Sequence, residues 1–139
     1  MYFQALPVRA IYTKVAGTVD FSKLNGLIPA VIQDDTSGEV LMVGFMNDEA
    51  LQLTRETGYA TFFSRSRNTL WKKGETSGNR LAVTALFTDC DDDTVVVKVR
   101  REGDGNVCHL NRRSCFVESR GPEVQGSKGP GVQGFGGSR

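Results

Sequence analysis

Runs of apolar residues separated by turn residues predict a protein built mainly of β-strands. Two such runs, Leu27–Gln33 and Glu39–Met46, flank the turn sequence D-D-T-S-G and therefore predict a β-hairpin. The second run, E-V-L-M-V-G-F-M, is almost continuously apolar, so we expect it in the centre of a sheet. Further strands are expected at Tyr59–Ser64, Leu81–Thr88 and Thr94–Arg101.

One principal helix is expected after the hairpin. Asn47 is a favoured N-cap residue, and Asp48 and Glu49 suit the positive end of the helix dipole. Gly58 is the residue type that commonly follows a helix C-terminus, so the helix should end near Thr57. One helix among several strands predicts an α+β, β-rich domain, arranged as a compact mixed sheet or pseudo-barrel.

The composition of the two ends differs from that of the centre. Residues 1–25 are expected to form a loosely attached N-terminal segment, in which Val19–Leu24 makes a helical turn with Phe21 and Leu24 packed inward. Residues 26–117 should form the folded domain. Residues 118–139 are rich in glycine with few apolar anchors, and are expected to be a disordered tail or linker.

The overall composition favours a small protein with a small-molecule partner. The 139 residues suit one domain, and a formal charge of +1 argues against general binding to nucleic acid or a membrane surface. No apolar run approaches the roughly 20 residues of a membrane helix. Free cysteines without a signal segment favour a reducing compartment. We therefore expect a cytoplasmic protein, or one in an organelle such as the plastid if a transit peptide has been removed.

The chemistry of the chain is concentrated between residues 89 and 115. All three cysteines lie there, Cys90, Cys108 and Cys115, together with the only histidine. An odd number of cysteines argues against a disulfide framework, and three thiolates suit zinc. The alternative is three buried free cysteines, because free Cys often packs as a small hydrophobe.

His109 directly follows Cys108, which bears on its role. In an extended chain neighbouring side chains point to opposite faces, so His109 is not expected to share one metal ion with Cys108. Three protein ligands and an open fourth position are typical of catalytic zinc. His109 is then the candidate general base for a zinc-bound water. The alternative is a structural histidine.

Three alternating carboxylates, Asp89, Asp91 and Asp93, are candidates for a hard cation such as Mg²⁺. In a straight strand the first and third would be about 13 Å apart, at roughly 3.3 Å per residue. One ion can contact all three only if the chain bends there. The alternative is a polar turn between two strands.

A basic, polar stretch from Arg65 to Arg80 is the candidate phosphate-binding region, although its simpler interpretation is a solvated loop. Guanidinium, hydroxyl and loop N–H groups together form anion sites. The residues of this kind are Ser64, Arg65, Ser66, Arg67, Lys72, Lys73, Thr76 and Ser77. Trp71 is expected in the core rather than stacked on a base. Arg112 and Arg113 are candidates for a second anion site.

Three motifs in this order resemble the phosphoribosyl-AMP cyclohydrolase family of histidine biosynthesis. They are S-R-S-R-N-T-L-W-K-K-G-E-T-S-G at Ser64–Gly78, D-C-D-D-D at Asp89–Asp93 and C-H-L-N-R-R-S-C-F at Cys108–Phe116. The resemblance covers Gly26–Phe116. It implies a homodimeric hydrolase that opens the adenine ring of N1-(5-phosphoribosyl)-AMP at the N1–C6 bond. It also implies that Zn²⁺ and Mg²⁺ are required.

Carried onto this chain residue by residue, the resemblance implies the following site. Zinc is held by Cys90, Cys108 and Cys115, contributed by both subunits, and magnesium by Asp89, Asp91 and Asp93. His109 is the base. The nucleotide with its two phosphates contacts Ser64, Arg65, Ser66, Arg67, Trp71, Lys73, Glu75, Thr76, Ser77, Arg112 and Arg113. In many relatives a pyrophosphohydrolase domain follows, and that second activity is not expected here.

Two other classes of function remain as alternatives. A zinc-dependent base deaminase also attacks a ring carbon, but that class requires H-x-E and P-C-x-x-C, and neither motif is present. A non-catalytic zinc module that binds RNA would need a closed site of four ligands and usually a more basic face.

Overall fold

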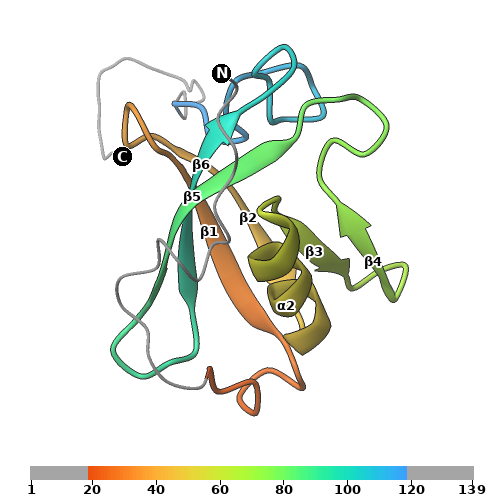
Figure 1. Cartoon of the computed structure of the whole chain (residues 1–139), viewed down its shortest axis with the longest axis vertical. Helices are drawn as coiled ribbons and strands as arrows, with labels where there is room; N and C mark the ends of the chain where they lie inside the picture. The colour runs from red at the N-terminus through yellow and green to blue at the C-terminus, as the bar shows by residue number, and fades with distance from the viewer. Residues whose placement is uncertain (1–18, 119–139) are drawn as a thin grey trace.

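The computed structural model describes residues 19–118 (Figure 1). The expectations for residues 1–18 and for the tail 119–139 lie outside the described residues. The described residues contain six strands and one helix, in the order β1 (Ile28–Asp34), β2 (Val40–Met46), α2 (Asp48–Thr57), β3 (Thr61–Ser64), β4 (Thr69–Lys72), β5 (Leu81–Thr88) and β6 (Val95–Arg101).

The strands form one mixed sheet of four and one smaller sheet of two. The order in the large sheet is β2-β1-β6-β5, in which β1 and β6 are parallel and the other two pairs are antiparallel. The small sheet is the β3–β4 hairpin. The predicted β-rich α+β class, mixed sheet and single principal helix are confirmed. Within residues 19–118 there is no helix long and apolar enough to cross a membrane.

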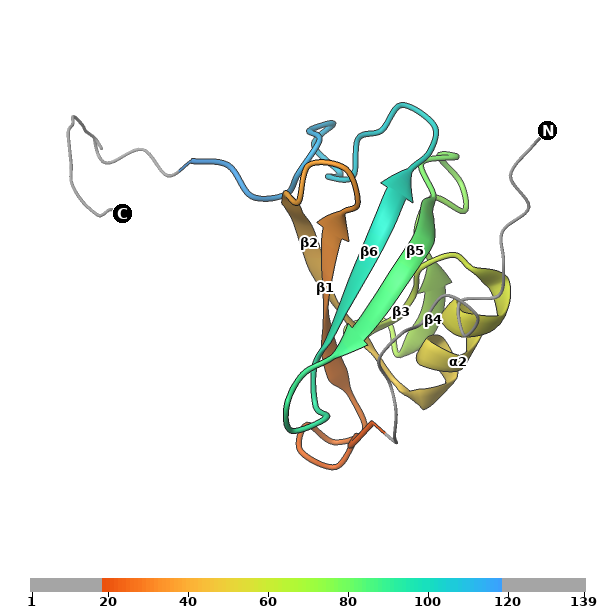
Figure 2. The ribbon, with the colours of Figure 1, turned by 60° about the vertical axis from the view of Figure 1, so that its left-hand side comes forward.

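Helix α2 has the predicted ends. The Asn47 side chain accepts a hydrogen bond from the N–H of Ala50, and Gly58 adopts the left-handed conformation with φ of 79°. The helix lies beside the small sheet (Figure 2). The buried hydroxyl of Thr54 accepts from the N–H of Thr61 at 3.0 Å, which fixes the helix to the start of β3.

The small sheet packs against the large one through an aromatic side chain. Phe62 on β3 is fully buried, and its ring lies 5.0 Å from the ring of Trp71 on β4. A Cβ atom at Gly44 of β2 would lie 2.6 Å from the Phe62 ring. Glycine at this position therefore allows the two sheets to approach closely.

Three local predictions were wrong. β2 is an edge strand of the large sheet rather than a central one. It reads as continuously apolar because the neighbouring residues Leu41 and Met42 are both buried, at a place where the pairing with β1 shifts by one residue. A covered edge strand and a central strand give the same sequence pattern.

The basic stretch contains a strand that the sequence did not predict. The short β4 pairs with β3, and Asn68 in the connecting turn adopts a left-handed conformation with φ of 53°. The third error concerns residues 19–24, which form turns and a bridge from Leu24 to Leu27 instead of a helical turn. Leu24 is 48% exposed, whereas Phe21 packs on the core as predicted.

Candidate active site

The candidate metal ligands lie in two loops at opposite ends of β6. Residues 89–93, which we call the aspartate turn, connect β5 to the start of β6. Residues 108–115, which we call the cysteine loop, follow its end (Figures 1 and 2). β6 has seven residues, which corresponds to about 20 Å of extended chain. Cys90 is therefore far from Cys108 and Cys115 within one chain.

The aspartate turn bends as an ion site would require. One carboxylate oxygen of Asp89 accepts the N–H groups of Asp93 and Thr94 at 3.1 and 3.3 Å, and Asp92 adopts a φ of 64°. Candidate ligand atoms of Asp89, Asp91 and Asp93 consequently lie within 4.8 Å of one another. The bend removes the separation of about 13 Å that a straight strand would impose.

A lysine outside the predicted site neutralises part of this charge. The Lys23 ammonium lies 3.1 Å from Asp91 and 3.0 Å from Asp93. The hydrogen bond from Lys23 is the main reason that the pKa of Asp93 is lowered. The two carboxylates in turn raise the pKa of Lys23. No local sequence signal marks Lys23 as part of this site, because it precedes Asp91 and Asp93 by 68 and 70 positions.

The cysteine loop brings two of the three thiols together. Cys108 is buried and Cys115 is exposed, and each thiol affects the pKa of the other. The N–H of Leu110 lies 3.4 Å from the Cys108 sulfur and is the largest cause of the lowered pKa of that thiol. Burial and the neighbouring Cys108 raise the pKa of Cys115. Two neighbouring thiols, one of them with a lowered pKa, are a good partial site for a soft metal ion.

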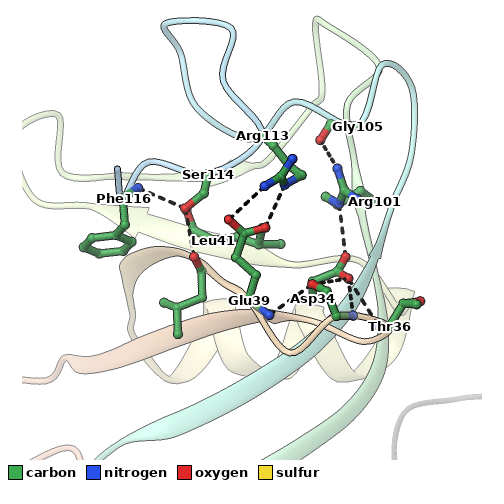
Figure 3. Close-up of polar contacts among 11 residues, drawn as sticks. Asp34, Thr36, Glu39, Leu41, Arg101, Gly105, Arg113, Ser114 and Phe116 are labelled. Atoms are coloured by element: carbon green, nitrogen blue, oxygen red, sulfur yellow. Dashed lines mark hydrogen bonds and ion pairs between the residues drawn. The ribbon is translucent and has the colours of Figure 1, made fainter. Parts of the chain in front are cut away.

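The cysteine loop is fixed to the free edge of β2. The Cys115 N–H donates to the Leu41 carbonyl at 2.8 Å, and the buried Ser114 hydroxyl donates to the Val40 carbonyl at 2.8 Å. The Arg113 guanidinium makes two hydrogen bonds to the Glu39 carboxylate, the shorter of 2.7 Å (Figure 3). Arg113 thus has a structural partner in this chain.

A second ion pair fixes the start of the segment that leads to the loop. Arg101, at the end of β6, donates to Asp34 at 3.0 Å and to the Gly105 carbonyl at 2.7 Å (Figure 3). Asp34 is buried. Its pKa is lowered chiefly by the N–H of Ser37, with a further contribution from Arg101. The β1–β2 hairpin therefore holds both ends of the segment that carries the two cysteines.

His109 and most residues of the basic stretch are exposed to solvent. His109 and Arg112 are exposed. Among the other candidates, Arg65, Ser66, Arg67, Glu75, Thr76 and Ser77 are exposed, and Ser64, Trp71 and Lys73 are partly buried. Trp71 packs on the core, as expected. The Arg65 guanidinium lies over the Phe45 ring at 4.0 Å, which orients this side chain at the start of the β3–β4 turn.

The basic stretch is joined to the chain that leads to the cysteine loop. The Asn79 side chain donates to the Asn106 carbonyl and accepts from the N–H of Asp104. The Lys73 charge acts on Cys115 in the direction that lowers its pKa. The hydrogen bonds of Asn79 therefore link the basic stretch to the segment before the cysteine loop.

The sequence was then compared with known proteins. A sequence model of the phosphoribosyl-AMP cyclohydrolase family matches residues 42–117. A phosphoribosyl-AMP cyclohydrolase of Caulobacter sp. (strain K31) is 60% identical over 92 residues, which is 66% of this chain and 69% of that protein. The phosphoribosyl-AMP cyclohydrolase of Pelobacter propionicus is 58% identical over 98 residues, which is 70% of this chain and 78% of that protein. The phosphoribosyl-AMP cyclohydrolase of Listeria innocua is 57% identical over 99 residues, which is 71% of this chain and 90% of that protein.

This chain belongs to the phosphoribosyl-AMP cyclohydrolase family. The resemblance inferred from the three motifs is confirmed. The relatives named above are bacterial and lend no support to the organelle alternative.

The buried Asp34 provides a test of how the hairpin is held. Asp34→Asn should lower the free energy of unfolding at pH 7 by about 1–2 kcal/mol, because a neutral amide cannot form the charged pair with Arg101. The folded-state pKa of Asp34 lies below its unfolded value. Its contribution is therefore complete above the ordinary Asp value of about 3.9 and is lost as the pH falls through the folded value.

Urea unfolding at pH 7 and near pH 3 measures this effect. The difference between wild type and Asp34→Asn should shrink at the lower pH. Asp35→Asn removes the neighbouring exposed carboxylate and serves as the control. A difference that is the same at both pH values would contradict the role given to the ionised carboxylate.

Proposed function

We propose that this chain hydrolyses N1-(5-phosphoribosyl)-AMP by opening its adenine ring at the N1–C6 bond, as a step of histidine biosynthesis. Membership of the family carries the proposal. The presence of Cys108 and Cys115 in one loop, where each affects the pKa of the other, and the bend of the aspartate turn support it, because they offer the two partial metal sites that such chemistry uses. The family assignment favours this reaction over deamination or RNA binding.

The donor atoms suit the two metals that we assign. Paired thiols suit zinc, and a close group of carboxylate oxygens suits magnesium. Zinc would be held by Cys90, Cys108 and Cys115, and magnesium by Asp89, Asp91 and Asp93. When bound to three protein ligands, zinc supplies a water whose pKa is lowered toward about 7.

We further propose that the zinc site is shared between two subunits. Cys90 lies at the opposite end of β6 from the other two thiols, so one chain alone does not bring the three sulfur atoms together. In a symmetric dimer the aspartate turn of each subunit would meet the cysteine loop of the other.

Exposed apolar side chains in and near the cysteine loop are consistent with a dimer. They lie on β2 and in residues 110–117, and are Val40, Val43, Leu110, Phe116 and Val117. Phe116 is 56% exposed and Val117 is 60% exposed in the single chain. A second subunit that covered them would remove this apolar area from water.

In the proposed reaction the protein binds and orients the nucleotide, and it transfers a proton. Exposed arginine and hydroxyl groups of residues 64–67 and 75–77, with Lys73 and Arg112, hold the two phosphates. Arg113, which is paired with Glu39, adds its positive charge to the groups that attract the phosphates. His109 takes a proton from the attacking water, whose oxygen forms a bond to C6. The N1–C6 bond then breaks and N1 receives a proton, so that C6 becomes a carboxamide carbon and N1 remains bonded to C2.

Zinc content and turnover together test the assignment of the cysteines. The purified chain should open the purine ring, which is followed by absorbance. Cys90→Ser, Cys108→Ser and Cys115→Ser should each lose both zinc, measured by elemental analysis, and activity. A full zinc complement in all three variants would refute the ligand assignment, and no turnover by the zinc-loaded wild type would refute the function.

Subunit mixing tests the shared site. Cys90→Ser and Cys108→Ser are each expected to be inactive. A mixed dimer keeps all three ligands in one site and loses two in the other, so mixing under conditions of subunit exchange should restore part of the activity. Mixing either variant with itself is the control. No recovery despite demonstrated exchange would indicate that each site lies within one chain.

The role of His109 is tested by its replacement. His109→Ala should retain zinc, dimerise and bind substrate, while kcat falls about 10²–10⁴-fold and KM changes less. If His109 only braced the loop, zinc or stability would fall in proportion to activity. If it were a ligand, zinc would be lost outright. A fully metallated, stable variant with near-normal kcat would exclude the proton-transfer role.

A further inference from the structure

Lys23 supplies a cation to the aspartate turn from a distant part of the chain. Its Nζ atom lies 3.1 Å from Oδ2 of Asp91 and 3.0 Å from Oδ2 of Asp93. These are two of the three carboxylates to which magnesium is assigned above. One side-chain nitrogen therefore bridges the oxygen atoms that a divalent ion would also use.

The segment that carries Lys23 is itself held against the turn. The Asp20 N–H donates to the Asp92 carbonyl at 2.7 Å. The Asp20 carboxylate accepts from both the N–H and the hydroxyl of Ser22, at 2.8 and 2.6 Å, which shapes the chain just before Lys23. The ammonium group is thus delivered by an ordered turn.

An ammonium and a magnesium ion cannot occupy this position together. Magnesium requires oxygen ligands at about 2.0–2.1 Å in octahedral arrangement. An ion bound to these two oxygens must therefore take the space in which Nζ now lies. Without any cation, three carboxylates with ligand atoms within 4.8 Å of one another would repel.

We propose that Lys23 is an internal counter-ion of the aspartate turn that a divalent ion must displace in order to bind. The inference rests on the magnesium assignment made above. Lys23 keeps the turn in its bent form before the ion arrives, and it weakens the ion's apparent affinity by competing for the same oxygens. Binding of the ion then releases the Lys23 side chain from the turn.

Calorimetric titration of the zinc-containing full chain with Mg²⁺ tests the competition. Lys23→Met should bind Mg²⁺ about 3- to 10-fold more tightly than wild type, an effect that should diminish at high salt because the groups are exposed. Lys23→Arg keeps the charge and should bind as weakly as wild type. Arg100→Met removes one exposed charge near the other end of β6, about 20 Å of extended chain from the aspartate turn, and should leave the affinity unchanged.

A spectroscopic measurement follows the displacement directly. The NMR signal of the Lys23 ammonium, identified by its absence in Lys23→Met, should shift toward that of a free lysine as Mg²⁺ saturates the site. An unmoved signal, or an affinity of Lys23→Met equal to or weaker than that of wild type, would overturn the inference.

Asp91→Asn separates failure of the inference from failure of the magnesium assignment. If Asp91→Asn binds Mg²⁺ as well as wild type does, magnesium is not held by the aspartate turn, and both proposals fall. If Asp91→Asn binds more weakly but Lys23→Met is unchanged, the magnesium assignment stands and only the role of Lys23 is wrong.

Discussion

The attachment of the cysteine loop to the edge of β2 is the interaction on which the candidate site depends. Carbonyl groups of β2 accept hydrogen bonds from the Ser114 hydroxyl and the Cys115 N–H. Glu39, just before the strand, forms an ion pair with Arg113. The loop has no regular secondary structure of its own. Its two thiols are therefore positioned by a strand that lies some 70 residues earlier in the chain, as the separation of 74 residues between Glu39 and Arg113 shows.

The same hairpin controls the other end of this segment through Asp34 and Arg101. Arg101 links a buried carboxylate to the Gly105 carbonyl, so the turn after β6 and the turn after β1 are joined. An exposed ion pair such as that of Arg113 with Glu39 contributes little by itself. Here the Arg113–Glu39 pair acts together with the Arg101–Asp34 pair and with backbone hydrogen bonds, all on the segment that carries the two cysteines. Together they restrict the directions in which Cys108 and Cys115 can point.

Local signals in the sequence were sufficient for the helix and most strands. Asn47 and Gly58 define the ends of α2 through cap geometry, which depends only on neighbouring residues. The edge position of β2 depends on what covers it, and no local pattern encodes that. The N-G pair at residues 25 and 26, with φ of 54° and 89°, is a strong signal for a tight turn. It predicts the turn that joins Leu24 to Leu27 just before β1.

The site residues divide in the same way. Clustering in the sequence identified the aspartates, which lie in the aspartate turn, and the pair Cys108 and Cys115, which lies in the cysteine loop. Lys23, Asp34 and Glu39 were missed, since each meets its partner across the fold and carries no motif. The separation of Cys90 from the other thiols follows from the length of β6, which the sequence had already predicted within one residue.

The parallel pairing of β1 with β6 also determines when the protein can complete its structure during synthesis. Val31 lies beside Val96, so the centre of the large sheet closes only after some 65 residues have been added to the first strand. The β1–β2 hairpin and α2 are formed from contiguous sequence and can appear early. The middle of the sheet and the anchor of the cysteine loop must wait for β6. A nascent chain that stops before this strand leaves the apolar hairpin without its central neighbour, and such species are prone to aggregate.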